Sequence, residues 1–218
     1  MWQLNIIQKI IVWAPPILFA ITVHEVAHGW MALKLGDKTA LMLGRLTLNP
    51  LKHIDMIGTI LIPLILLLFS PIIFGWAKPV PVNPNNLKKP RRDMAFVALA
   101  GPISNIIMAL IWAAITKIGS ILMGHGLQFA LPIVLMGRAG ILINLVLMIL
   151  NLIPIPPLDG SRVVAAILPP KLAYKYDRIA PYGFFILLLL LVTGILRLLL
   201  WVPIVLLQRL ILTIFGLG

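Results

Sequence analysis

Cysteine is absent from this 218-residue sequence, and acidic residues are few. Without cysteine the chain forms no disulfide bond, and a metal ion could be held only by histidine and carboxylate side chains. Six residues are aspartate or glutamate against 18 lysines and arginines, and all charged residues together make up 11% of the chain. Because an ordinary soluble domain carries about 25% charged residues, this low charge argues against a soluble protein.

Hydrophobic residues make up 61% of the chain and are grouped in long runs. The runs cover residues 5–33, 57–74, 94–118, 131–153 and 180–217. Since one membrane-spanning helix takes about 20 residues, the sequence predicts an all-α polytopic membrane protein with about five to six transmembrane helices. We expect one membrane-embedded domain over 1–218, with a core at about 5–170 and a C-terminal helical segment at about 180–217 that Arg197 and Pro203 interrupt.

The net charge of +12 would suggest a nucleic-acid partner in a soluble protein. Here most basic residues lie between the apolar runs, where they indicate membrane topology, so we expect a lipid bilayer and no nucleic acid as partner. The basic run at 88–92 is typical of a cytoplasmic loop. The oligomeric state is left open.

The motif His24-Glu25-Val26-Ala27-His28 lies inside the first apolar run. On a helix, two histidines four residues apart share one face and can bind one Zn²⁺, with the glutamate placed to act as a base. The alternative is a chance grouping of polar residues. An ionisable group inside a membrane costs about 2.5–3.5 kcal/mol, so three within five residues favour a metal site. Glu25 is the only glutamate in the chain.

A catalytic zinc needs a third protein ligand. Asp159 follows a proline-rich break in an apolar run, where a single carboxylate requires a partner. His53 and Asp55 are alternatives, since we expect them near the same side of the membrane. His125 is expected on the opposite side. The remaining aspartates lie beside basic residues and are interpreted as solvated surface groups: Asp37, Asp93 and Asp177.

The topology follows from the basic run at 88–92 and from the need for Asp159 to reach the two histidines. Residues 34–56, 75–93 and 159–179 should all lie on the cytoplasmic side, and 119–130 on the other. The run at 57–74 therefore cannot cross fully, and we predict a re-entrant or membrane-embedded hairpin there. Residues 44–50 suggest a short strand or hairpin, and the prolines of 75–86 predict an extended segment.

Three motifs in order resemble those of site-2 proteases, the zinc intramembrane metalloproteases. They are His24 to His28, then Gly101-Pro102-Ile103-Ser104-Asn105, then Asn151 to Gly160 with its Pro-Ile-Pro-Pro-Leu-Asp-Gly ending. Residues 75–83, Gly-Trp-Ala-Lys-Pro-Val-Pro-Val-Asn, are similar to a signature of compact bacterial and archaeal members. The resemblance covers about residues 10–170, and we find neither a PDZ insertion nor a CBS domain.

The resemblance implies a multi-pass cell-membrane enzyme that cleaves transmembrane segments of membrane-protein substrates, with its active site near the cytoplasmic side. It implies one Zn²⁺ per chain on His24, His28 and Asp159, with Glu25 as the catalytic residue. It also implies that Asn151 assists substrate or oxyanion binding, although a buried amide there could equally hold the unwound backbone of residues 154–157. Asn105 is a second substrate-binding candidate, although a buried amide after Gly-Pro equally suggests an interhelical hydrogen bond. A membrane metal or ion transporter using the same histidine and aspartate cluster is the alternative function.

Overall fold

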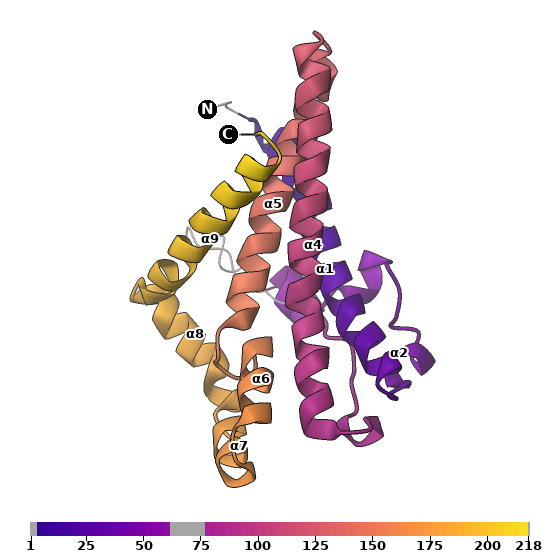
Figure 1. The fold of residues 1–218 in the computed structure, drawn as a ribbon, viewed down its shortest axis with the longest axis vertical. Coiled ribbons are helices and arrows are strands. Elements are labelled where there is room, and N and C mark those ends of the chain that lie inside the picture. Colours follow the sequence, from indigo (N-terminus) through magenta and orange to yellow (C-terminus); the bar gives the residue numbers. More distant parts are fainter. Residues whose placement is uncertain (1–3, 62–76, 218) are drawn as a thin grey trace.

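The computed structural model describes residues 4–61 and 77–217 of the chain (Figure 1). All regular structure in these ranges is helical, which confirms the all-α class. Four helices in the described ranges are long and apolar enough to span a membrane: α1 (Ile6–Lys34), α4 (Pro90–Gly124), α5 with its preceding turn (Gln128–Leu152) and α9 (Ile195–Ile214). The hairpin predicted at 57–74 lies mostly outside the described residues, apart from the end of a short π-helix, η2 (Met56–Leu61).

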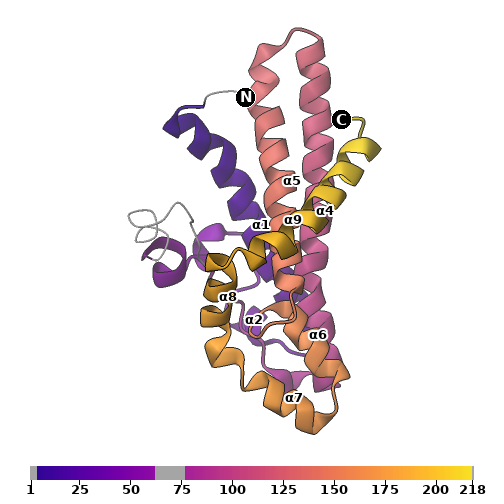
Figure 2. The same cartoon turned by 90° about the vertical axis from the view of Figure 1, so that its left-hand side faces the viewer.

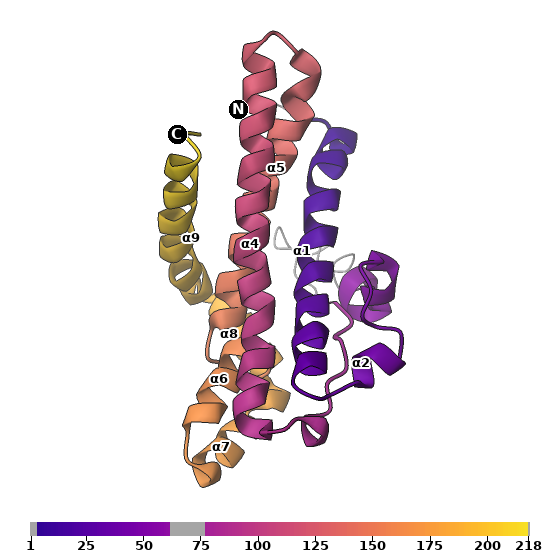
Figure 3. The same cartoon turned by 45° about the vertical axis from the view of Figure 1, so that its right-hand side comes forward.

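Two antiparallel helices, α4 and α5 (Leu131–Leu152), form the centre of the molecule, and α1 and α9 lie on opposite sides of this pair (Figure 3). A short 3-10 turn, η4 (Gln128–Ala130), precedes α5. Small residues let the central helices approach closely, since a Cβ added at Gly140 would overlap the Trp112 ring. The buried core joins Ala109, Trp112 and Ala113 of α4 to Ile141 and Leu145 of α5 and Ile211 of α9.

The C-terminal apolar run forms two helices, α8 (Gly183–Val192) and α9. The expected interruption falls at Gly194 and not at Arg197 or Pro203. Gly194 has a φ of 77°, a left-handed conformation that glycine adopts without steric cost. Pro203 lies inside α9, as prolines in membrane-spanning helices often do.

The segments beside α1 contain only short helical turns: α2 (Thr39–Met42), η1 (Pro50–His53) and η3 (Pro84–Asn86). The strand or hairpin expected over 44–50 is wrong, because residues 45–49 have no regular structure and Pro50 begins η1. No backbone ladder forms there; instead the Arg45 guanidinium donates to the carbonyl oxygens of Lys78 and Pro79. Residues 77–83 have no regular structure either, in keeping with their prolines.

Two further short helices, α6 (Asp159–Ile167) and α7 (Pro170–Asp177), lie at the same end of the molecule as α2 and the start of α4, and the turn η5 (Ala180–Tyr182) leads into α8 (Figures 1 and 2). The loop between α4 and α5 lies at the opposite end, towards which the start of α1 and the end of α9 also point. Thus α2, η3, the start of α4, α6 and α7 lie towards one end, whereas η1 lies nearer the middle of the molecule (Figure 2). The side of a membrane that each faces stays a prediction.

Candidate metal centre

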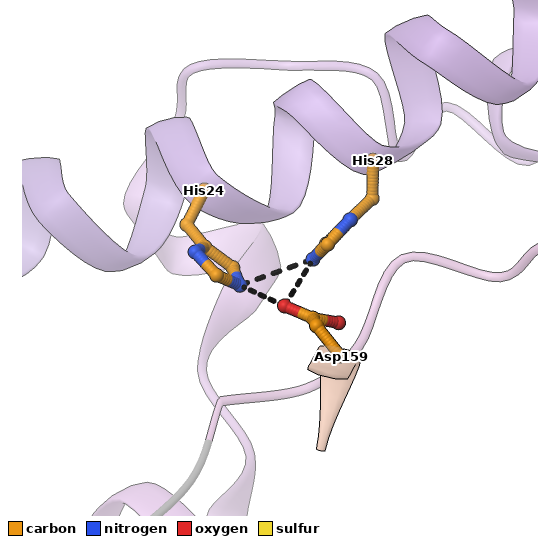
Figure 4. Close-up of side chains that lie close together, drawn as sticks. All are labelled: His24, His28 and Asp159. Atoms are coloured by element: carbon orange, nitrogen blue, oxygen red, sulfur yellow. Dashed lines mark hydrogen bonds and ion pairs between the residues drawn. The ribbon is translucent and has the colours of Figure 1, made fainter. Parts of the chain in front are cut away.

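Helix α1 carries both histidines of the motif on one face, and α6 supplies the aspartate. His24 and His28 are 6% and 9% exposed, and Asp159 is the first residue of α6. Figure 4 shows the two imidazoles pointing from α1 towards the Asp159 carboxylate. The two Nε2 atoms are 3.0 Å apart, and they lie 3.2 and 3.3 Å from Asp159 Oδ2. These three residues form a group that could hold a metal ion.

The outer hydrogen bonds of the imidazoles fix which ring nitrogen faces the cluster. His28 Nδ1 lies 2.7 Å from the carbonyl oxygen of Val97, which can only accept, so His28 Nδ1 carries the proton. His24 Nδ1 likewise donates to Asn105 Oδ1 at 2.6 Å. In the neutral rings both Nε2 lone pairs therefore face the Asp159 carboxylate.

A cation accounts for this arrangement. Three electron-rich atoms otherwise repel one another in a buried place, and Asp159 Oδ2 is buried without a hydrogen-bond partner. Tetrahedral zinc with bonds of about 2.0–2.1 Å would hold its ligand atoms about 3.3 Å apart, close to the distances seen here. The donor set of two imidazoles and one carboxylate, without thiolate, fits a zinc site with one open position.

Gly101 on α4 makes room for the cluster. A Cβ added there would lie 2.5 Å from both His24 Cε1 and His28 Nε2. Any side chain at this position would meet both rings. The Gly-Pro sequence at 101–102 therefore allows α4 to pass directly against the imidazoles of α1.

Asn105 holds His24 and is itself held by Asn144 of α5. Asn105 and Asn144 are both fully buried. Asn105 Nδ2 donates to Asn144 Oδ1 at 2.9 Å and to the Ala20 carbonyl oxygen at 3.3 Å, and Asn144 Nδ2 donates to the Gly140 carbonyl oxygen. Asn105 thus makes the interhelical hydrogen bonds of one sequence interpretation, and its contact with substrate stays a prediction. Asn144 was not predicted from the sequence, although a lone amide in an apolar run is a signal for a buried polar contact.

Several contacts place Asp159 against the end of α5. A Cβ added at Gly160 would overlap the carbonyl group of Leu152, so only glycine lets α6 turn back so closely. Tyr176 donates its hydroxyl to the Pro154 carbonyl oxygen at 2.7 Å. At the other end of α6, Arg91 donates to the carbonyl oxygens of three residues: Ala165, Ala166 and Leu168. The helix that begins with Asp159 is thereby fastened at both ends.

Glu25 lies beside the irregular segment 77–83. Its Oε2 accepts a hydrogen bond from the Val80 backbone N–H at 2.7 Å. The Val80 side chain is buried, and a Cβ added at the opposite glycine of α1, Gly29, would lie 2.8 Å from it. The segment therefore runs along α1 directly beside Glu25 and Gly29.

The structure separates the alternative third ligands from the histidines. His53 is 2% exposed and its Nε2 donates to the Thr47 carbonyl oxygen, while Asp55 accepts from the N–H groups of Ile57 and Gly58. Neither belongs to the metal-binding group found among the described residues. His125 ends α4 at the opposite end of the molecule, as expected.

Two aspartates expected at the surface are fully buried, so that expectation was wrong. Asp93 accepts from the Lys89 N–H and from Arg92. Asp37 accepts from Thr39, Asn83 and Asn86. Burial by itself raises the pKa of Asp37, but these hydrogen bonds outweigh it and hold the pKa of Asp37 below its ordinary value of 3.8. Asp177 is partly exposed, 3.7 Å from Arg162, in keeping with the expectation.

Asn151 is half-buried on the last turn of α5, and its Nδ2 donates to the carbonyl oxygen of Leu147 in the same helix. It does not hold the proline-rich break, a role that falls to Tyr176. Its substrate contact stays a prediction.

Four apolar helices and a buried cluster of two histidines and an aspartate define a multi-pass membrane protein with a candidate metal centre. The chain is 40% identical to "Putative zinc metalloprotease YwhC" of Bacillus subtilis over 189 residues, which cover 85% of this chain and 82% of that protein. It is 28% identical to "Putative zinc metalloprotease Rip2" of Mycolicibacterium smegmatis and 30% identical to that of Mycobacterium tuberculosis. These matches span 81% and 80% of this chain but only 64% and 63% of the two Rip2 proteins.

The chain belongs to the zinc metalloprotease family of YwhC. Zn²⁺ is the metal that this membership implies, and His24, His28 and Asp159 form a group that could bind it. The relatives do not favour the transporter alternative. No protein-family model matches the sequence, and no solved structure gives a significant match.

Proposed function

We propose that this protein is a site-2 protease, a zinc endopeptidase that cleaves peptide bonds within or beside the transmembrane segments of membrane proteins. In this proposal His24, His28 and Asp159 hold one zinc ion within a single membrane-embedded domain. The convergence of their three ligand atoms, 3.0–3.3 Å apart beside the apolar helices, carries the proposal. The metal, when bound, polarises the scissile carbonyl group and lowers the pKa of water.

Glu25 is the proton carrier in this proposal. It follows His24 directly on α1 and is the only glutamate in the chain. A carboxylate there can take a proton from the attacking water and deliver it to the leaving amine. Glu25 Oε2 accepts a hydrogen bond from the Val80 N–H, which holds the carboxylate beside the segment 77–83.

The segment 77–83 offers a docking edge for an unwound substrate. A helical substrate must unfold locally before hydrolysis, and its freed backbone groups then need partners. In extended backbone, residues two apart direct their N–H and C=O groups to one side. With residues 80–82 extended, as their prolines predict, the backbone groups of Val82 would face the side on which the Val80 N–H meets Glu25. Such strand pairing would place the substrate beside Glu25, the proposed general base. Asn151 would be a further contact.

The cytoplasmic placement of the active site rests on charge. The basic run at 88–92 begins α4 at the end of the molecule that also carries α6 and α7. Because positive loops face the cytoplasm, the metal centre would open to cytoplasmic water, which hydrolysis requires.

The decisive experiment compares purified wild-type protein with Glu25→Gln on single-span membrane substrates in detergent, with zinc measured in both. The variant should keep its zinc and lose cleavage, since glutamine cannot carry the proton. Equal cleavage by both proteins would refute the proposed mechanism. Loss of zinc from Glu25→Gln would instead assign Glu25 to metal binding.

A further inference from the structure

The peptide group that joins Pro79 to Val80 is held from both sides. Its N–H group donates to Glu25 Oε2 at 2.7 Å. Its carbonyl oxygen lies 3.4 Å from Arg45 Nη2, and the same Arg45 nitrogen donates to the Lys78 carbonyl oxygen at 3.0 Å. Arg45 is therefore connected through one peptide group to Glu25, the proton carrier of the proposed function.

The residues next to this contact pack on one glycine of α1. A Cβ added at Gly29 would lie 2.8 Å from the Val80 side chain and 3.1 Å from the Leu46 side chain. Leu46 directly follows Arg45 in the chain. Arg45 thus reaches the peptide group from a segment that rests on the same part of α1 as Val80 itself.

Arg45 is not a freely solvated basic residue. It is half-buried, and its Nε atom is buried without a hydrogen-bond partner in the described part of the chain. Burying part of a guanidinium costs free energy, because the charge loses contact with water. The two carbonyl oxygens offset this cost through charge-assisted hydrogen bonds, which are stronger than those between neutral groups. The contact therefore holds residues 78–79 more firmly than a solvated side chain would.

A positive charge near the carbonyl oxygen of a peptide group also strengthens the hydrogen bond that its N–H donates, because linked hydrogen bonds polarise one another. Within the part of the chain that the structure describes, the Val80 N–H is the only hydrogen-bond donor to the Glu25 side chain. We propose that Arg45 is a positioning residue for Glu25, which it holds through the Pro79–Val80 peptide group. This role rests on the proposed function, in which Glu25 carries the proton.

The first test uses the fact that Glu25 is the only glutamate in the chain. Glutamate labelled with a carbon isotope at its side-chain carboxyl group gives one carboxyl NMR signal from the zinc-loaded protein, and this signal does not depend on cleavage. Arg45→Met should shift the signal, and Arg45→Gln, which keeps a neutral donor, should shift it less. Lys52→Met is the matched control, because it removes an exposed positive charge from the same stretch of chain. Its signal should match that of the wild type.

The second test is cleavage of a single-span membrane substrate in detergent. Arg45→Met should lower kcat by about tenfold or more, because a small displacement of a reacting group slows the chemical step strongly. KM and zinc content should stay near those of the wild type. Arg45→Lys keeps a charged donor and should recover part of the lost kcat, whereas Lys52→Met should cleave as the wild type does.

An unshifted carboxyl signal in Arg45→Met would overturn the proposal, whatever the activity of the variant. A shifted signal with an unchanged kcat, or with a rise in KM alone, would also overturn it, because Arg45 would then not act on the proton transfer. If Arg45→Met lost its zinc, the same two measurements on Arg45→Gln would decide. If the wild type held zinc but cleaved no substrate, the proposed function would fail, and the carboxyl signal would still show whether Arg45 holds Glu25.

Discussion

Asn144 and Asn105 are joined by one hydrogen bond, from Asn105 Nδ2 to Asn144 Oδ1 at 2.9 Å, which fixes the direction in which the Asn105 amide points. With Nδ2 turned to Asn144, Oδ1 must face His24 and accept its Nδ1 proton. Asn144 therefore orients a candidate metal ligand that it does not touch. Residues in such positions commonly change metal affinity about 10- to 100-fold when they are replaced.

Replacing Asn144 should accordingly weaken zinc binding. Asn144→Leu removes the acceptor for Asn105, so the amide can turn and present its NH₂ group to His24. We expect zinc affinity, measured by chelator competition, to fall by about tenfold or more. Thr116→Val is the control. Thr116 is equally buried, but its hydroxyl donates only within its own helix, α4, to the Trp112 carbonyl oxygen. Similar zinc affinity in both variants would contradict the orienting role.

A methyl group at position 101 should disrupt the cluster. The added Cβ of Gly101→Ala would lie 2.5 Å from both imidazoles. Either the rings move apart or α4 shifts, at a cost of about 1–3 kcal/mol for such overpacking, and we expect bound zinc to be lost. Gly124→Ala on the same helix meets nothing within 4 Å and should keep its zinc. Full zinc content in Gly101→Ala would contradict this close approach of α4 to the imidazoles of α1.

Asp37 should make the stability of the protein decrease in acid, because its ionised carboxylate accepts the hydrogen bonds that hold residues 83–86. Its pKa in the folded protein is below its ordinary value of 3.8, so its stabilising contribution is fully present above 3.8. That contribution is lost as the pH falls through the lower, folded-state pKa. Thermal unfolding in detergent should therefore show a stability decrease in acid that Asp37→Asn lacks, with the variant less stable at neutral pH. Asp177→Asn, at an exposed site, should keep the acid dependence.

Accessibility to labelling tests the topology. The cysteine-free sequence allows single cysteines at exposed positions: Lys38, Asn85, Lys175 and His125. The first three should react with a membrane-impermeant reagent from the cytoplasmic side, and His125→Cys only from the other side. If positions 38 and 85 react from opposite faces, residues 57–74 cross the membrane fully and the predicted hairpin is wrong.

Proline at position 82 should impair substrate docking. Val82→Pro removes the N–H group that a paired substrate would need, while Val82→Ala keeps it. We expect slower cleavage by the proline variant, near-normal cleavage by the alanine variant, and unchanged zinc in both. Normal cleavage by Val82→Pro would exclude strand pairing at this edge.

The sequence identified the cluster because polar residues in apolar runs need partners, a condition that His24, His28 and Asp159 satisfy together. The same condition applies to Asn144, a polar residue in an apolar run for which the sequence alone offered no partner. Asp37 and Asp93 were misjudged for another reason. Asp37 accepts from Asn83 and Asn86 as well as from nearby Thr39, and sequence proximity cannot reveal the two distant partners. Asp93 is bonded to its sequence neighbours Lys89 and Arg92, but its burial depends on the packing of the folded chain around the start of α4.

The strand expected over 44–50 failed because a short alternation of apolar and polar residues needs a backbone partner to become a strand. The neighbouring segment, 77–83, is rich in proline and has few backbone N–H groups to donate. It is therefore contacted by the Arg45 side chain and not by a ladder of backbone hydrogen bonds. The helical spans were easier to predict, since their length and hydrophobicity act over about 20 residues at once.

The origin of Asp159 on α6 affects when the enzyme becomes complete. The two histidines lie on α1, which is synthesised before α4 and α5, whereas the aspartate arrives only with α6, which follows them in the chain. A nascent chain that ends before α6 would thus carry two of the three proposed zinc ligands and could not cleave nearby membrane proteins. Hydrolytic competence would then mark the completion of assembly.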